Sequence, residues 1–173
     1  MKLVVLRKNA ISEKLKRKII LLKRSEWKFT LKSHTEWFEK QIKNIDSHIL
    51  LFNKKELIGY NLLRKRNFYL NLKKKIKKNY LYFDTLIIKK KFRKKNLSKI
   101  IIDKSLEISQ KKKLPLILIC QKKNIIFYKR NRFILLKKKL INFQDHEFTS
   151  HAMIYMKKIN NLLITNKLNI NLN

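Results

Sequence analysis

The chain has 173 residues, the length of one domain with a sizeable core. Hydrophobic residues make up 45% of it, too many for a disordered basic tail, and no apolar run approaches the roughly 20 residues that span a bilayer. The single cysteine excludes an internal disulfide, and a reducing cytoplasm is the simplest setting for such a chain. We therefore expect a cytoplasmic, soluble protein without a membrane partner.

The charge is strongly one-sided: 45 Lys and Arg residues face 11 Asp and Glu residues, a formal net charge of +34. One interpretation is a polyanionic partner such as RNA, DNA or anionic lipid. The other is codon bias of an A+T-rich genome, because Gly and Pro occur once each while Lys, Ile and Asn abound. The lysines are scattered along the whole chain, which favours codon bias. Nonspecific polyanion binding is expected in either case.

The first part of the chain predicts a short strand and two helices. Leu3–Leu6 is an apolar strand. Ser12 can cap a following helix, in which apolar residues as far as Leu22 keep helical spacing. Ser33–Glu36 is a capping-box pattern that predicts the start of a second helix, with Ile45 on its apolar side.

Antiparallel strands are predicted next. His48–Phe52 and Leu57–Arg64 flank the polar turn Asn53–Lys55 and form a hairpin. Gly59 lies inside the second strand, where a bulge or a close approach of another segment is the usual reason for glycine. A basic turn then separates two further strands, Asn67–Leu72 and Tyr80–Ile88.

The second half predicts a strand–helix–strand crossover. Its helix follows a basic loop and carries Leu97, Ile101 and Ile108 on one stripe. Further elements are expected at Leu116–Cys120 (strand), Asn124–Arg130 (short helix), Phe133–Leu136 (strand) and Phe148–Met156 (strand). We expect a single α+β domain over residues 1–157, with a mixed, mostly antiparallel central sheet flanked by helices. Residues 158–173 form a C-terminal tail, expected to be a loose helix or disordered.

The segment Tyr80–Glu107, YLYFDTLIIKKKFRKKNLSKIIIDKSLE, is the most informative part of the chain. It combines a buried strand, a basic loop and an amphipathic helix. Amide N–H groups at the start of a helix lack partners within it, so this junction is a natural site for a diphosphate. The alternative is a solvated lysine loop, which a chain this basic would often contain.

Two motifs in this half resemble the GNAT superfamily of acyl-CoA-dependent N-acyltransferases. The first is similar to the family's Arg/Gln-x-x-Gly-x-Gly/Ala at the start of a helix: Arg93 and Ser98 match, while Asn96 replaces the first glycine. Asn tolerates left-handed backbone angles better than most residues, so we expect the turn to be preserved. The second, from Asn124, resembles Asn-x-x-Phe-Tyr-x-x-x-Gly-Phe, with Arg132 in place of glycine. The resemblance covers residues 48–136.

The resemblance implies a site for acyl-CoA, most simply acetyl-CoA. Backbone amides of the basic loop would bind the pyrophosphate at the helix N-terminus. A strand edge would bind the pantetheine arm through its backbone. The residues implied in cofactor binding are Leu86, Ile87, Ile88, Arg93, Lys94, Lys95, Asn96, Leu97, Ser98 and Asn124.

The resemblance also implies that Tyr128 protonates the departing thiolate. A phenol suits this step because it holds its proton at neutral pH and can give it to a basic sulfur. The alternative is a core tyrosine beside Phe127. For removal of the proton from the amine, Asp84 is the best candidate, because it shares a strand face with Tyr82 and Leu86 in an apolar setting that could raise its pKa. A surface or backbone-bonded Asp84 is equally consistent, and a water chain could replace it.

Other reactive side chains carry less information. Cys120 has no His in a partner context and fits a buried strand cysteine. The histidines are too dispersed to argue for a metal site, so none is expected. Trp27 and Trp37 are interpreted as core or pocket-wall residues.

The sequence therefore predicts an N-acetyltransferase that moves an acetyl group from acetyl-CoA to a primary amine by direct attack in a ternary complex. By resemblance, the helices around His34–Phe38 would line the acceptor side. A small amine, an amino sugar and a protein amino group all remain open as acceptors, as does the oligomeric state. The alternative is a non-catalytic nucleic-acid or ribosome-associated binding protein on the same fold. The charge and the missing glycines at Asn96 and Arg132 support that alternative.

Overall fold

The computed structural model describes residues 1–71, 75–137, 141–143, 150–157 and 168–170. They form an α+β domain with a mixed, mostly antiparallel sheet flanked by helices, as the sequence predicted. Its contacts divide into two units: unit 1 is Met1–Arg64 with Asp84–Ser105, and unit 2 is Lys65–Phe83 with Leu106–Asn173. Three long elements run through both units: β3 (Glu56–Asn71), β4 (Lys75–Ile88) and α3 (Leu97–Lys112).

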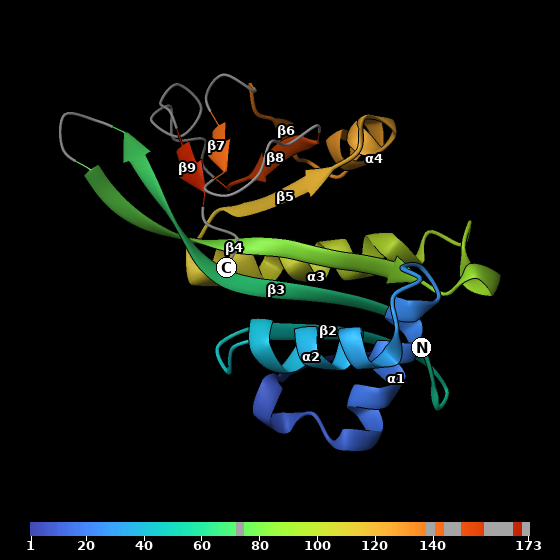
Figure 1. The fold of residues 1–173 in the computed structure, drawn as a ribbon. Coiled ribbons are helices and arrows are strands. Elements are labelled where there is room, and N and C mark those ends of the chain that lie inside the picture. Colours follow the sequence, from blue (N-terminus) through green and yellow to red (C-terminus); the bar gives the residue numbers. More distant parts are fainter. Residues whose placement is uncertain (72–74, 138–140, 144–149, 158–167, 171–173) are drawn as a thin grey trace. The chain divides into compact units, whose positions relative to one another are not determined.

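Unit 1 contains the strand order β1-β2-β3-β4. Strand β1 (Lys2–Arg7) pairs antiparallel with β2 (Ser47–Asn53), and β2 pairs antiparallel with β3. Helices α1 (Glu13–Arg24) and α2 (Leu31–Gln41) lie side by side next to β2 (Figure 1). The predicted first strand, hairpin and pair of helices are confirmed.

The helix starts show how local capping sets the boundaries. The Ser12 hydroxyl accepts a hydrogen bond from the Leu15 amide, as predicted for α1. In α2 the cap is Thr30, whose hydroxyl accepts from the Ser33 amide. The prediction that α2 begins with a capping box at Ser33 is therefore wrong, because Thr30 already satisfies this amide. Ile45 lies beyond the end of α2 and is 51% exposed.

Strand β3 separates two packed layers within unit 1. On one face, Tyr60 and Leu62 belong to the hydrophobic cluster shared with α1 and α2. On the other, a Cβ atom on Gly59 would lie 2.8 Å from Cδ1 of Ile101 in α3. The pairing register also skips one residue, because Leu51 faces Gly59 while Phe52 faces Leu57. Gly59 therefore lies beside a bulge and permits close approach, which are the two reasons expected for it.

Unit 2 is built on the strand order β4-β5-β8-β6. Strand β5 (Leu116–Cys120) runs parallel to β4, which confirms the crossover through α3. Strands β8 (His151–Tyr155) and β6 (Ile134–Leu135) complete this order with antiparallel pairing. The short helix α4 (Ile125–Arg130) follows the 3-10 turn Lys122–Asn124.

Two short strands extend unit 2 beyond what the sequence predicted. Strand β9 (Leu168–Ile170) pairs with β3 and with β7 (Ile141–Phe143), and the side chains of Leu168 and Ile170 are fully buried. The expectation of a loose or disordered tail is therefore wrong for these three residues. Their backbone pairing and apolar burial outweigh an Asn-rich composition. Residues 158–167 and 171–173 of the predicted tail lie outside the described residues.

Other boundaries also differ, and strand β4, predicted from Tyr80, begins at Lys75. The segments predicted as separate strands at Leu57–Arg64 and Asn67–Leu72 are one continuous strand, β3. The strand predicted at Phe148–Met156 is observed as His151–Tyr155, with residues 148–149 outside the described part of the chain. Charged side chains between apolar positions do not end a strand whose backbone pairs on both sides.

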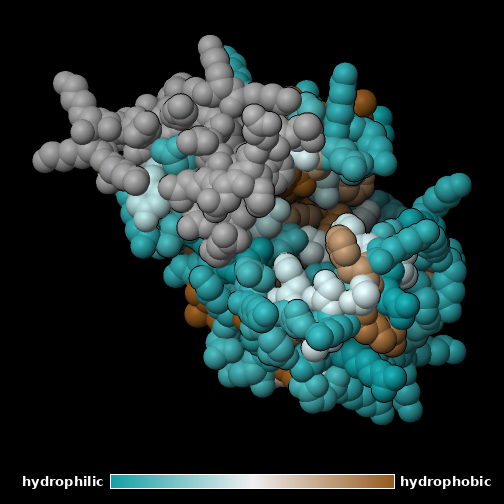
Figure 2. Space-filling model, in the orientation of Figure 1, coloured by the Kyte–Doolittle hydropathy of each residue, from teal (hydrophilic) through white to brown (hydrophobic). Residues whose placement is uncertain are grey.

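The surface reflects the composition. Hydrophilic residues cover most of the described surface seen in Figure 2, with small hydrophobic areas between them. Among the described helices, none is long and apolar enough to cross a membrane.

Candidate active site

The end of β4 carries an irregularity that the sequence did not reveal. Thr85 has φ 63°, which is rare for a β-branched residue and costs energy in an isolated chain. Strand alternation is broken here, since Asp84, Thr85 and Leu86 are all half-buried. The Thr85 hydroxyl donates a 2.8 Å hydrogen bond to Asp84 Oδ1. The positive φ of Thr85 thus interrupts the regular alternation of β4 just before Leu86–Ile88.

The basic loop between β4 and α3 has the backbone of an anion site. Lys94 and Asn96 have φ of 63° and 54°, whereas φ is not positive at Lys95 between them. Such alternation turns successive amides toward one concavity. Leu97 and Ser98 then open α3, and their amides have no acceptor within the helix. The loop therefore presents N–H groups at a helix N-terminus, as a diphosphate site requires.

Arg93 holds this loop in place. Its Nε donates a 2.9 Å hydrogen bond to the carbonyl of Ile88, the last residue of β4. Its guanidinium also pairs with Glu26, just after α1. In addition, the Lys89 amide donates to the Ile58 carbonyl at 2.8 Å. The loop is thus anchored to the strand ends beside it.

In unit 2, the second motif covers the short helix α4 and its end. Helix α4 ends with paired backbone bonds from Arg132 to Lys129 (3.0 Å) and from Phe133 to Tyr128 (3.1 Å). This is a Schellman motif, whose penultimate residue is left-handed and usually glycine. Arg132 occupies that position with φ 72°. Asn96 and Arg132 therefore both have the left-handed backbone conformation that glycine adopts most easily.

Tyr128 lies among aromatic rings. Its ring centroid is 6.1 Å from that of Phe83 and 5.7 Å from that of Phe133, both in edge-to-face geometry. Burial raises the pKa of the Tyr128 phenol above its ordinary value, and the Cys120 thiol acts in the same direction. The phenol is therefore a proton donor and not a phenolate at neutral pH. Asn124, four residues earlier, is exposed and makes no capping hydrogen bond with its side chain.

Asp84 lies in an ionic setting, which differs from the apolar one expected from the sequence. Its Oδ2 is 3.4 Å from Nη1 of Arg64, a buried side chain of β3. The alternation of residues along β4 predicted apolar neighbours for Asp84 within its own strand. It could not show that Arg64 of β3 lies beside Asp84. Glu56, the weaker candidate base, pairs with Lys89 and Lys91 at the surface.

Asp84 also faces a pocket of about 420 Å³ within unit 1. Its lining consists of Lys23, Trp27, Phe29, Ser33, His34, Trp37, Asp84 and Thr85. The expected pocket-wall role of both tryptophans is confirmed, and His34 lies in the helix predicted to line the acceptor side. Lys23 was missed, although one signal was available: it lies on the side of α1 that buries Ile19 and Leu22.

The remaining candidates have simpler roles. Cys120 is buried in β5, with its Sγ 3.8 Å from the Met153 sulfur, and burial raises the pKa of its thiol. It is a buried strand cysteine, as expected. Over the residues that the structure covers, no group of three or more His, Cys, Asp or Glu side chains is placed to hold a metal ion.

Comparison with known proteins defines the family. A model of the acetyltransferase (GNAT) family matches residues 17–133, which is more than half of the chain and includes both motifs. This protein belongs to the GNAT acetyltransferase family. No curated protein sequence matches the chain.

Solved structures show the same fold. GNAT family N-acetyltransferase YhbS from Escherichia coli, in complex with CoA, has a TM-score of 0.68 at 11% identity, covering 99% of this chain and 89% of that one. NAA60 from Arabidopsis thaliana, in complex with a bisubstrate analogue, has a TM-score of 0.62 at 14% identity and covers 90% and 98%. A spermidine N-acetyltransferase SpeG chimera from Vibrio cholerae and hSSAT has a TM-score of 0.62 at 15% identity and covers 90% and 96%. At such identities the likeness concerns the fold alone.

Proposed function

We propose that this protein is an N-acetyltransferase that moves the acetyl group of acetyl-CoA to a primary amine by direct attack in a ternary complex. The observation that carries the proposal is the left-handed backbone at Lys94 and Asn96, directly before the first amides of α3. Without any glycine, the loop has the conformation that a pyrophosphate group needs. Membership of the GNAT family supports the acyl-CoA class of ligand.

In this proposal the cofactor-binding residues belong to three segments. The amides from Lys94 to Ser98 bind the pyrophosphate, with Lys95 adding charge. The backbone of Leu86, Ile87 and Ile88 binds the pantetheine arm, directly after the left-handed Thr85 interrupts the regular strand. Asn124, which is exposed at the start of α4, contacts the same arm.

The chemistry needs two proton transfers. The neutral amine attacks the thioester carbonyl carbon, a C–N bond forms, and the C–S bond breaks. The departing thiolate takes the proton of the Tyr128 phenol, whose raised pKa keeps it protonated until that step. The proton that the amine gives up goes to the Asp84 carboxylate or to water. Asp84 suits this role through its position at the pocket wall beside Thr85.

The alternative, a nucleic-acid-binding protein without turnover, loses one of its two supports. The replaced glycines at Asn96 and Arg132 do not disturb the backbone, since φ is 54° and 72° at these positions. The net charge of +34 remains as its support.

The test is thermal unfolding with and without CoA and acetyl-CoA. A ligand at 100 times its dissociation constant stabilises by about 2.7 kcal/mol, which is roughly 5–10 °C for a chain of this size. Because a chain this basic attracts any polyanion, the titration is repeated near 1 M salt, where screening acts over about 3 Å. ATP serves as the polyanion control.

The expected result is a CoA shift that survives the salt and exceeds that of ATP, followed by thiol release in the presence of an amine. If CoA and ATP give the same salt-sensitive shift, and RNA binds more tightly than either, the protein is a polyanion binder and the enzyme proposal fails.

A further inference from the structure

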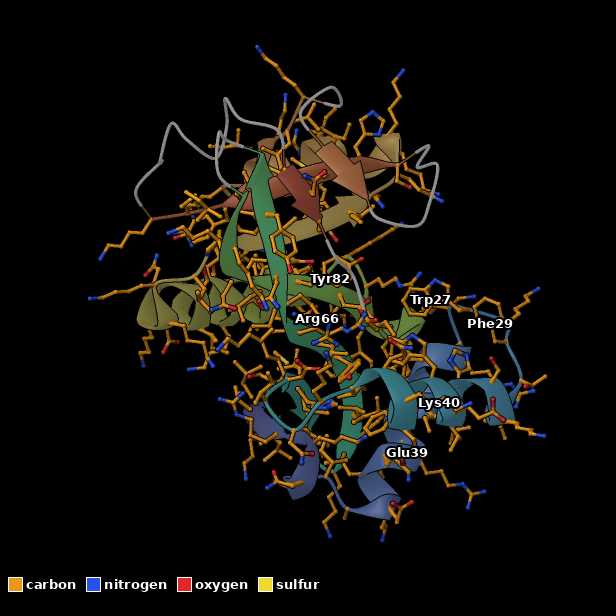
Figure 3. The ribbon with its side chains drawn as sticks, turned by 60° about the vertical axis from the view of Figure 1, so that its left-hand side comes forward. Trp27, Phe29, Glu39, Lys40, Arg66 and Tyr82 are labelled. Carbon is orange, nitrogen blue, oxygen red and sulfur yellow. The ribbon has the colours of Figure 1, made fainter. Side chains whose placement is uncertain are left out.

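The pocket of about 420 Å³ has aromatic walls. Trp27 and Phe29 lie on the segment joining α1 to α2 (Figure 3), and they are 40% and 62% exposed. His34 orders this segment: its Nε2 is 3.0 Å from the Trp27 carbonyl oxygen, and its ring meets Phe29 edge-on at 5.8 Å. Large aromatic faces left open around a pocket indicate a ligand with a flat apolar body.

A buried ammonium group also faces this pocket. Lys23 is 7% exposed, and its Nζ lies 3.2 Å from the centroid of the Trp37 ring. Within the described residues, no hydrogen bond from Nζ contributes to the pKa of Lys23, which is set by burial and by the charges of Asp84 and Arg64. An ammonium group carries three donors, and a ring face replaces little of their hydration. Lys23 therefore has unused capacity to bind an acceptor group inside the pocket.

Two charged side chains, from β3 and β4, act on Lys23. The carboxylate of Asp84 lies against the Arg64 guanidinium at 3.4 Å. Arg64 also lies 5.6 Å from the Trp37 ring, so two cations share this aromatic side chain. Burial lowers the pKa of Lys23 from 10.5 to about 8, with Asp84 opposing the change and Arg64 reinforcing it. At neutral pH the group is charged, and both Asp84 and the cationic Arg64 act on it.

We propose that the acceptor is an amine that carries a carboxylate beside an aromatic or large apolar body, as an aromatic amino acid does, and that Lys23 binds this carboxylate. This inference rests on the proposed acetyltransferase function. Lys23 is then a specificity-determining residue: it attracts an anionic group and disfavours polyamines, which would add positive charge. The aromatic walls formed by Trp27, Phe29 and Trp37 hold the apolar body.

Matched pairs of acceptors test the carboxylate directly. L-Phenylalanine and phenethylamine differ only by this group, as do L-tryptophan and tryptamine, and spermidine represents polyamines. With acetyl-CoA and thiol release as the readout, we expect kcat/KM to be at least about tenfold higher for the amino acid of each pair, as for a charge-assisted hydrogen bond. Equal or higher kcat/KM for the decarboxylated amine, or for spermidine, overturns the inference.

A binding measurement gives an answer that does not depend on turnover. Phenylalanine is added to the CoA-bound protein, and the fluorescence of Trp27 and Trp37 is followed. Saturable quenching by phenylalanine at concentrations where phenethylamine has no effect is expected. If CoA stabilises the protein but phenylalanine causes no saturable change, the acceptor inference fails while the proposed function stands. If CoA itself gives no specific thermal shift, the proposed function fails, and the acceptor inference fails with it.

The variant Lys23→Met keeps an unbranched side chain of similar length and removes the charge. We expect the ratio of kcat/KM for phenylalanine to that for phenethylamine to fall to about 1, with binding of CoA unchanged. Lys14→Met is the matched control, because Lys14 is exposed on the same helix and its loss changes the net charge equally. If Lys23→Met keeps the preference, or Lys14→Met loses it to the same degree, Lys23 does not bind the carboxylate.

Discussion

Arg93 donates a hydrogen bond from Nε to the carbonyl of Ile88 at 2.9 Å. This contact joins the start of the basic loop to the last residue of β4. The same guanidinium pairs with Glu26, the residue before Trp27, so one side chain connects the loop with the segment that forms the aromatic pocket. We therefore predict that Arg93 contributes to the proposed CoA site mainly by holding the loop in place, and less by adding positive charge.

Substitutions of Arg93 can separate the effect of its hydrogen bond from the effect of its charge. We expect Arg93→Lys to lose the Ile88 contact while keeping the charge, and so to reduce the thermal shift caused by CoA about as much as Arg93→Met does. The cost to the stability of the free protein is small, about 0.5–1.5 kcal/mol for one hydrogen bond. Thermal unfolding with and without CoA at high salt measures both effects. A wild-type shift in Arg93→Lys would mean that charge is what counts.

Asn96 tests the left-handed turn at the helix start. Asn96→Gly removes the strain of φ 54° and is expected to bind CoA at least as well as the wild type. Asn96→Val places a β-branched side chain in the same conformation and is expected to weaken binding by about tenfold or more. Isothermal titration with CoA compares the three proteins. Equal affinity in Asn96→Val would show that the loop binds without this conformation.

Tyr128→Phe removes the proton donor and leaves the ring. We expect kcat to fall by roughly 10²-fold, which is typical for loss of general acid catalysis, while CoA affinity changes little. Because the pKa of the phenol is raised, Tyr128 should impose no loss of rate between pH 6 and pH 9. Steady-state rates across this range, with Phe127→Leu as a packing control, measure the effect. Unchanged kcat in Tyr128→Phe removes it from the acid role.

Lys113 offers a stability test away from the site. It follows α3 with φ 53°, and the amides of Lys113 and Leu114 bond to the carbonyls of Gln110 and Ser109. This is again a Schellman motif with a non-glycine residue in the left-handed position. Lys113→Gly is expected to stabilise the protein by about 1 kcal/mol. Lys112→Gly, at the last residue of the helix, should not stabilise the protein, because Lys112 does not have a positive φ. Urea unfolding compares the two, and equal effects would contradict the assignment.

Lys23 makes stability depend on pH. Below about pH 8 the ammonium is charged in the folded and the unfolded protein, and its burial costs free energy only in the folded state. The difference between 10.5 and about 8 corresponds to roughly 3 kcal/mol. Between these values the folded protein loses the proton first, so the wild type becomes more stable as pH rises.

We therefore expect Lys23→Met to be more stable than the wild type at pH 7, by up to about 3 kcal/mol, and this gain to shrink as the pH rises towards 10.5. Urea unfolding at pH 7 and pH 10, relative to Lys14→Met, isolates the effect from the general charge of the chain. Besides Lys23, the charged or titratable groups near the pocket are Asp84, Arg64, His34 and His48. A gain that does not depend on pH would show that Lys23 is not buried as a cation.

The elements that the sequence predicted well are those decided by local patterns. Ser12 is both a good cap and the residue before an apolar stripe, and Leu116–Cys120 is an apolar run of strand length. The errors arise where the secondary structure of a segment depends on pairing with a segment far away in the sequence. Leu168–Ile170 is a strand because β3 and β7 pair with it, and nothing in the Asn-rich tail indicates those partners.

The candidate site follows the same division. Loop residues Lys94–Ser98 and Tyr128 could be proposed as site residues because their spacing along the chain carries the pattern. Thr85 was missed, since no sequence rule places a β-branched residue at positive φ. The ion pair of Asp84 with Arg64 depends on the register of two strands, which short-range alternation does not reveal.

The left-handed residues Asn96 and Arg132 have a wider consequence. In a nucleotide- or cofactor-binding motif, glycine is favoured because it easily adopts a left-handed backbone conformation. This chain, which has a single glycine, adopts that conformation at Asn96 and Arg132 with other residue types. A pattern that requires glycine at these two positions would pass over such a chain. A search written in backbone angles would find it.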